Sequence, residues 1–229
     1  MEDASRVWWW AFLAVSTVHL AGQLAGSDLV QTLTKPLLMP ALLGWALTSV
    51  PTSRLRTLLL IALAWSWLGD LGLMPEGETW FMLGLGAFLV AQLTYATAFW
   101  PLRAHSLLLQ RPVAALPYGV ALLGLLAVLW ADLGDLRLPV TIYAVVIVSM
   151  AVLATGLNRA AAIGAGLFVV SDALIALNSL TGALRLPAHG FWVMLSYLAA
   201  QALLAQGIRA GALHGPQIRG ASRPPTHAG

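Results

Sequence analysis

The sequence predicts an all-α membrane protein, a bundle of about eight transmembrane helices. Apolar residues make up 59% of the chain and charged residues 9%, whereas roughly 25% of a soluble protein is charged. The apolar residues form continuous runs rather than the alternation typical of a membrane β-barrel. Lysine and arginine are also divided very unevenly between the two sides that these runs define. Together these observations indicate helices that cross a bilayer.

A helix needs roughly 20 residues to cross the bilayer core. The segments that approach this length are residues 8–25, 36–50, 55–74, 80–100, 113–130, 138–157, 160–180 and 189–208. We expect them to form one transmembrane domain over residues 1–208. A tail rich in glycine, serine and proline follows over residues 209–229, and we expect it to be disordered and cytoplasmic.

The boundaries of the first four segments follow from tryptophan and proline. The first segment begins at Trp8, a residue type that anchors helices at the membrane interface. The second is the shortest and has Pro36 in its opening turn. The third lies between Pro51 and Pro75, and proline commonly ends a helix. The fourth ends at Trp100, a second interfacial anchor.

The last four segments are delimited in the same way. The fifth follows Pro112 and ends at Trp130, and the sixth begins near Pro139. The seventh follows Arg159 in a short loop, and the eighth follows Pro187. Each boundary therefore carries a residue that breaks a helix, anchors it at the interface or stays in water.

The positive charges predict the orientation. One side of the predicted bundle holds nine of them: Arg6, Arg54, Arg56, Arg103, Arg111, Arg159, Arg209, Arg219 and Arg223. The other side holds three: Lys35, Arg137 and Arg185. The positive-inside rule makes the first group cytoplasmic, so both termini are expected inside. The short loops favour a bacterial cytoplasmic membrane, and the scattered arginines argue against a nucleic-acid partner.

A weak internal similarity suggests a duplication. Leu68-Gly69-Asp70-Leu71 in the third segment resembles Val170-Ser171-Asp172-Ala173-Leu174 in the seventh. Two four-helix halves in the same orientation would place the two aspartates at equivalent positions. Chance similarity among apolar helices is the alternative.

Asp70 and Asp172 are the acids that loops and helix ends do not accommodate. A carboxylate facing hydrocarbon costs at least about 2.5–3.5 kcal/mol, so both should face the interior of the bundle. Their positions place them roughly 6 Å and 12 Å from the outer helix ends. They are either a functional pair in the outer half of the membrane or buried acids held by hydroxyl and backbone groups.

Other polar residues reach the same depth and are expected to bind substrate: Lys35, Gln92, Tyr95, Tyr143, Asn178 and Gln201. Each one alone is better explained as interhelical hydrogen bonding, but their convergence on one level indicates a site. His19 and His189 are the histidines near the aspartates, so a three-histidine zinc site cannot be assembled. A mixed histidine–aspartate metal site is the alternative to our expectation of no metal and no cofactor.

Several stretches of the chain resemble the YhhN family, from Lys35 to about Gln201: Lys35-Pro36-Leu37-Leu38-Met39-Pro40, Ser66-Trp67-Leu68-Gly69-Asp70, Gly84 to Tyr95, and Ser171-Asp172 with Asn178. The resemblance implies a lysoplasmalogenase-like membrane hydrolase that acts on a lysophospholipid among membrane lipids. Such an enzyme cleaves the vinyl ether of a lysoplasmalogen to a fatty aldehyde and glycerophosphoethanolamine or glycerophosphocholine.

The aspartate pair fits this chemistry independently. An enol ether hydrolyses by protonation of its β-carbon, and water captures the resulting oxocarbenium ion. The reaction needs one carboxylic acid as the proton donor and one carboxylate that stabilises the cation and activates water. The sequence leaves open which aspartate is which, although the deeper Asp172 is favoured as the donor.

Two other classes of function remain. Paired intramembrane acids also occur in small proton- or cation-coupled carriers. A non-catalytic lipid-binding protein is the other alternative. The oligomeric state does not follow from the sequence.

Overall fold

A computed structural model describes residues 2–179 and 186–214, and its regular structure over these ranges is entirely helical. The long helices are α1 (Glu2–Ala25), α2 (Asp28–Ser49), α3 (Arg54–Gly72), α4 (Glu78–Phe99), α6 (Pro112–Leu129), α7 (Arg137–Ala154), α8 (Arg159–Ser179) and α9 (His189–His214). Three short elements connect them: η1 (Trp100–His105), α5 (Leu107–Gln110) and η2 (Gly134–Leu136). Each predicted segment overlaps one long helix, so the all-α class is confirmed.

Within the described ranges, six helical stretches are long and apolar enough to cross a membrane: Arg54–Gly72, Glu78–Gln110, Pro112–Leu129, Gly134–Ala154, Arg159–Asn178 and His189–Leu213. The chain is therefore an integral membrane protein by the length and composition of its helices. Helices α1 and α2 do not belong to this group. The count of eight membrane crossings stays a prediction.

Three boundaries differ clearly from the prediction. Helix α1 begins at Glu2 rather than at residue 8. Helix α2 begins at Asp28 rather than near residue 36, and Pro36 and Pro40 lie inside it. Proline at position 40 has no N–H to donate to the carbonyl of Pro36. The indole Nε1 of Trp67 donates to that carbonyl instead, over 2.9 Å, so the helix continues through the prolines.

The third difference concerns the end of the last helix. Helix α9 continues past residue 208 to His214, because apolar residues extend beyond Arg209. The rest of the predicted tail, residues 215–229, lies outside the described part of the chain.

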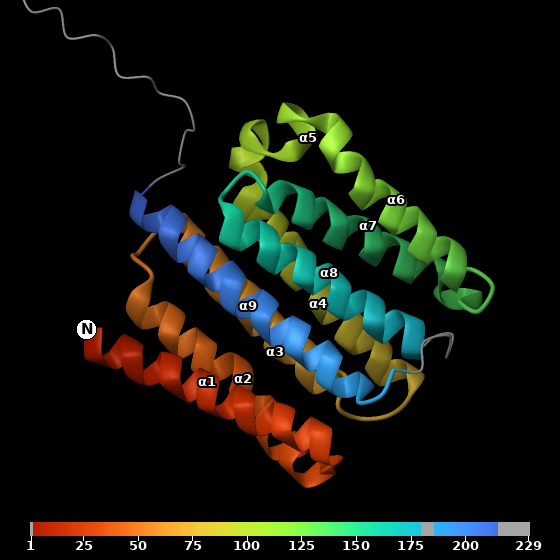
Figure 1. Cartoon of the computed structure of the whole chain (residues 1–229), viewed down its shortest axis with the longest axis horizontal. Coiled ribbons are helices and arrows are strands. Elements are labelled where there is room, and N and C mark those ends of the chain that lie inside the picture. The colour runs from red at the N-terminus through yellow and green to blue at the C-terminus, as the bar shows by residue number, and fades with distance from the viewer. Residues whose placement is uncertain (1, 180–185, 215–229) are drawn as a thin grey trace, which may run out of the picture.

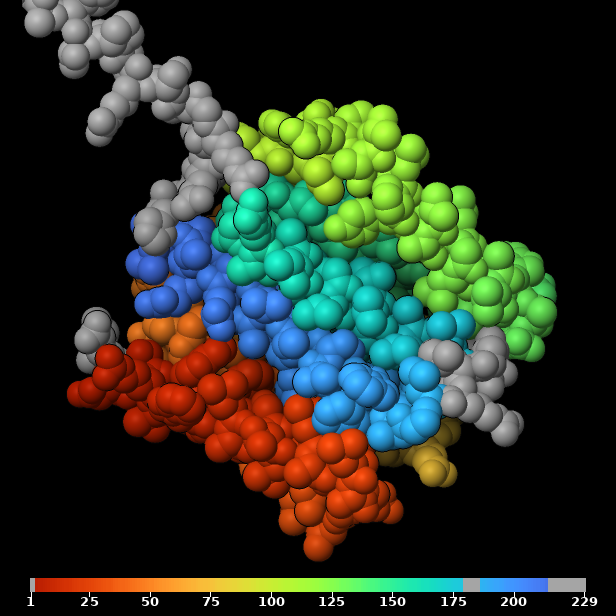
Figure 2. Space-filling view, in the orientation of Figure 1, coloured from red at the N-terminus to blue at the C-terminus, as the bar shows by residue number. Residues whose placement is uncertain are grey.

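The long helices lie side by side (Figure 1). Helices α1 and α2 form one edge of the molecule, and α6 forms the opposite edge (Figure 2). Helix α3 packs along α4, and α8 packs along α9. Glycine residues allow the helices of each pair to pack closely. A Cβ on Gly72 of α3 would lie 2.9 Å from the backbone of Gly84 on α4, and a Cβ on Gly164 of α8 would lie 2.9 Å from the carbonyl of Ala200 on α9. Close backbone contact of this kind is typical of membrane helices. The predicted duplication itself stays untested.

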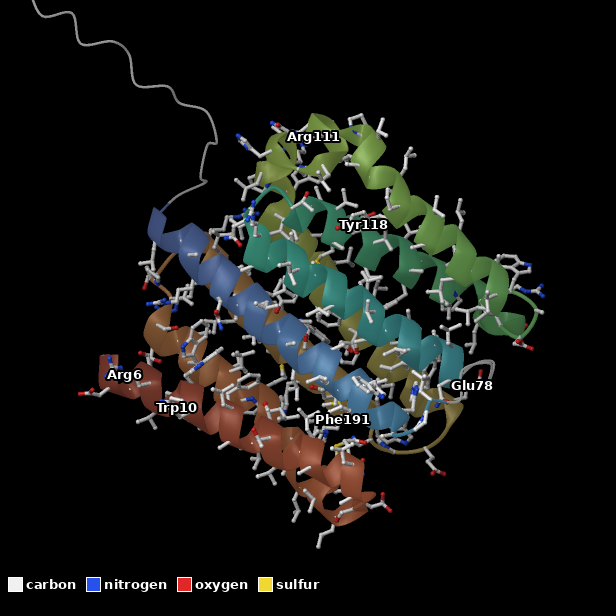
Figure 3. The ribbon with its side chains drawn as sticks, in the orientation of Figure 1. Arg6, Trp10, Glu78, Arg111, Tyr118 and Phe191 are labelled. Carbon is white, nitrogen blue, oxygen red and sulfur yellow. The ribbon has the colours of Figure 1, made fainter. Side chains whose placement is uncertain are left out.

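The predicted arginine-rich side corresponds to one end of the bundle. Arg209 Nε donates to the carbonyl of Ser49 over 3.1 Å, joining the C-terminal part of α9 to the last turn of α2. Arg54 donates to the carbonyl of Thr97 over 3.1 Å, joining the start of α3 to the end of α4. The opposite end of the bundle includes Glu78, labelled in Figure 3. Which end faces the cytoplasm stays a prediction.

Candidate active site

Asp70 lies in the last turn of α3 and is 3% exposed. The Tyr197 hydroxyl, from the middle of α9, donates to Asp70 Oδ2 over 2.8 Å. Ser66 lies one helical turn before Asp70, and its buried hydroxyl has no hydrogen-bond partner among the described residues. The carboxylate therefore faces the interior of the bundle, where a tyrosine from a distant part of the chain satisfies one of its oxygens.

A directed chain of hydrogen bonds ends on Asp70. Tyr95 on α4 donates to Gln201 Oε1 over 2.7 Å. The amide nitrogen of Gln201 faces the Tyr197 hydroxyl at 3.4 Å. Because a hydroxyl can accept one hydrogen bond while donating another, Tyr197 can link Gln201 to Asp70. The predicted residues Tyr95 and Gln201 thus reach Asp70 through Tyr197, which was missing from the predicted site.

Asp172 has a separate partner and a different environment. The hydroxyl of Tyr143 on α7 donates to Asp172 Oδ2 on α8. Both residues line a cavity of about 260 Å³ between α4, α6, α7 and α8. Its wall is otherwise apolar except for Tyr118 on α6, which is labelled in Figure 3. The Asp172 carboxyl group thus lines a cavity that is suited to a hydrocarbon chain.

Phe88 on α4 connects the two environments. Its ring lines the cavity that contains Asp172 and meets the ring of Tyr197 edge-on, with the centroids 5.8 Å apart. On α3, a Cβ at Gly69 would lie 2.6 Å from the Phe88 ring, so glycine leaves room for it beside Asp70. Phe88 therefore lies between the cavity that Asp172 lines and the Asp70–Tyr197 pair.

The remaining predicted residues lie at different places relative to the two aspartates and the cavity. Lys35 on α2 is half-buried, and its charge acts on Asp70 and on His19. Gln92 on α4 is buried beside the Tyr143 hydroxyl, and its amide has no hydrogen-bond partner within the described ranges. Such an amide could bind a ligand or a water molecule. Asn178 is exposed near the end of α8 and does not line the cavity.

The described residues contain no cluster of three or more histidine, cysteine or acidic side chains that could hold a metal. Both ring nitrogens of His19 have hydrogen-bond partners. Nδ1 lies 2.8 Å from Thr34 Oγ1, and Nε2 lies 3.4 Å from the amide nitrogen of Gln23. The Thr34 hydroxyl donates to the carbonyl of Val30, so it accepts from Nδ1–H. This arrangement fixes the tautomer of His19, with Nδ1 as the donor and Nε2 as the acceptor.

Fold and site together define a polytopic α-helical membrane protein with a half-buried carboxyl group, Asp172, in the wall of an apolar cavity and a second, buried carboxyl group, Asp70, behind Phe88. The chain belongs to the YhhN family, whose family model matches residues 30–208. Proteins named lysoplasmalogenase from Mycobacterium bovis and Mycobacterium tuberculosis are each 35% identical to it over 206 residues, which is 86% of this chain and 77% of theirs. No solved structure matches the chain.

Proposed function

We propose that the chain is an intramembrane lipid hydrolase that cleaves the vinyl ether of a lysoplasmalogen. The similarity to proteins named lysoplasmalogenase supports this class of activity. The structural observation that carries it is the position of Asp172, a carboxyl group in the wall of an otherwise apolar cavity. If the hydrocarbon chain of the substrate lay in that cavity, the vinyl ether bond at its polar end would lie next to the Asp172 carboxyl group.

In the proposed reaction, Asp172 donates a proton to the β-carbon of the enol ether. The Tyr143 hydroxyl occupies Oδ2, so Oδ1 is the oxygen that would carry the proton. Protonation of the carbon leaves an oxocarbenium ion, and water adds to its carbon and returns a proton to the site. The resulting hemiacetal then breaks into the fatty aldehyde and the glycerophospho-alcohol, so that one water molecule is consumed.

Asp70 would act as the carboxylate partner. Its Oδ2 accepts a hydrogen bond from the Tyr197 hydroxyl, and an ionised carboxylate acts only as an acceptor. A carboxylate at this position would stabilise the oxocarbenium ion and accept a proton from the attacking water. The unpaired amide of Gln92, next to Tyr143, could orient that water.

Lys35 and Asn178 would contact the polar part of the substrate. Lys35 is partly exposed, so its ammonium group can reach a phosphate while remaining close to Asp70. The glycerophosphoethanolamine or glycerophosphocholine leaving group would then lie at the end of the bundle opposite the arginines. This geometry agrees with the predicted topology, eight crossings of a bacterial cytoplasmic membrane with both termini inside.

The decisive substrate test compares two lipids that differ in one double bond. Detergent-purified protein should release fatty aldehyde from a lysoplasmalogen but not from the matching saturated alkyl ether, because the β-carbon of the saturated chain has no double bond to accept a proton. A coupled carrier would release no aldehyde, and a lipid-binding protein would retain the lysoplasmalogen unchanged. Absence of turnover by folded protein would refute the hydrolase assignment.

A further inference from the structure

A second hollow lies at the arginine-rich end of the bundle, between α1, α2, α8 and α9. Its volume is about 620 Å³, and Arg6, Trp9, Trp45, Ser49 and Arg209 are among the residues that line it. Figure 1 shows that α1 begins and α9 ends at this end of the molecule. The hollow is distinct from the aspartate site, because Arg209 follows Tyr197 by twelve residues of α9, or roughly 18 Å of helix.

The charged side chains that line this hollow are all positive. Arg6 and Arg209 line it, and no carboxylate does so among the described residues. The bond from Arg209 Nε to the carbonyl of Ser49 holds that guanidinium group in place and uses one of its five N–H donors. Planar guanidinium groups bind phosphate through paired hydrogen bonds. The hollow is therefore suited to an anion with phosphate-like geometry.

Tryptophan side chains line the hollow together with the two arginines. The rings of Trp9 and Trp45 pack with their centroids 5.1 Å apart, and Trp45 is 7% exposed. Trp10, labelled with Arg6 in Figure 3, also lines the hollow and is 67% exposed. Indole rings of this kind are typical of the membrane interface. The ligand should accordingly have an apolar part beside its phosphate, as a lipid has.

We propose that this hollow binds the phosphate of an anionic phospholipid, with the glycerol and upper acyl region against the tryptophans. A zwitterionic lipid is disfavoured, because its ammonium group would face two guanidinium groups without a carboxylate. Basic residues at the cytoplasmic surface typically attract anionic lipids, which agrees with the predicted orientation of this end. The proposed lipid site does not depend on the hydrolase reaction.

The test uses the full chain, purified in a neutral detergent. Short-chain phosphatidylglycerol should raise the melting temperature and remain bound in native mass spectrometry. Phosphatidylcholine of the same chain length and inorganic phosphate should do neither. Arg6→Gln should weaken phosphatidylglycerol binding about fivefold, as expected for one basic residue at a lipid surface, and Arg209→Gln should do the same.

Arg54→Gln is the matched control. Arg54 lies at the same end and donates to a helix carbonyl as Arg209 does, but it does not line the hollow. Arg6 is exposed, so Arg6→Gln tests the site even if Arg209→Gln disturbs the end of α2. Equal binding of phosphatidylcholine, or unchanged affinity in Arg6→Gln and Arg209→Gln, would overturn the proposal. Equal protection by inorganic phosphate would overturn the lipid assignment.

Discussion

The Tyr197 hydroxyl donates to Asp70 Oδ2 over 2.8 Å, although the two residues are 127 positions apart in the chain. This bond joins α9 to the last turn of α3. Phe88 and Phe168 pack edge-on against the Tyr197 ring and hold it in position. The orientation of the Asp70 carboxylate thus depends on a side chain from the far end of the sequence.

Tyr197→Phe should therefore impair the reaction while leaving the packing of the ring intact. A hydrogen bond to a charged group contributes about 1.5–3 kcal/mol, so we expect kcat to fall roughly ten- to a hundredfold, with a smaller change in KM. Tyr95→Phe, at the far end of the same hydrogen-bond chain, should have a weaker effect. Wild-type turnover by folded Tyr197→Phe would show that the bond is merely structural. Rates of aldehyde release and a thermal melt separate these outcomes.

The apolar cavity should determine which chain lengths are accepted. Ala121 on α6 lines the cavity, and Ala121→Leu should fill part of it. A methylene that a hydrophobic pocket gains or loses is worth about 1–3 kcal/mol, so kcat/KM for the longest chains should fall at least about fivefold relative to short chains. Ala127→Leu makes the same change at an exposed position of α6 outside the cavity and should leave the preference unchanged. The same shift in both variants would contradict the assignment of the cavity.

Activity should survive exhaustive chelation. His19 has both ring nitrogens engaged by Thr34 and Gln23, and the proposed reaction needs only proton transfer. The measurement is aldehyde release before and after treatment with EDTA, followed by addition of single divalent ions. Loss of turnover with EDTA and its recovery with one particular ion would show that a metal takes part.

The topology can be tested with reporter fusions. A reporter after His214 should be cytoplasmic, and one inserted at Glu76, between α3 and α4, should lie on the opposite side. The reason is the concentration of arginines at the end where α9 stops, together with the positive-inside rule. Reporters on the same side would overturn the predicted orientation.

The sequence revealed the long helices and the two acids because both depend on composition alone. Continuous apolar runs predict helices, and the cost of burying a carboxylate singles out Asp70 and Asp172. The start of α2 was placed too late because prolines usually interrupt helices. Only the structure shows that the Trp67 indole satisfies the carbonyl that Pro40 leaves without a partner.

The partners of the acids were harder to predict. Tyr197 and Gln201 are four residues apart and thus share a helix face, and this spacing was the available signal for Tyr197. That α9 would turn this face toward Asp70 depends on helix packing, which hydropathy does not encode. The side chain of Asn178 is exposed near the end of α8, so its contact with the substrate stays a prediction.

The central claim is that Asp70 and Asp172 act together as proton donor and carboxylate. Its most direct test is aldehyde release from a lysoplasmalogen by purified Asp70→Asn, Asp172→Asn and the double variant, with thermal melts as the folding control. Acid–base groups contribute about 10²–10⁴-fold, so each single variant should be at least about a hundredfold slower. The double variant should be little worse than the poorer single variant, because residues that act as a unit are not additive. Near-normal turnover by either folded single variant would contradict the pair and leave these acids with a structural role.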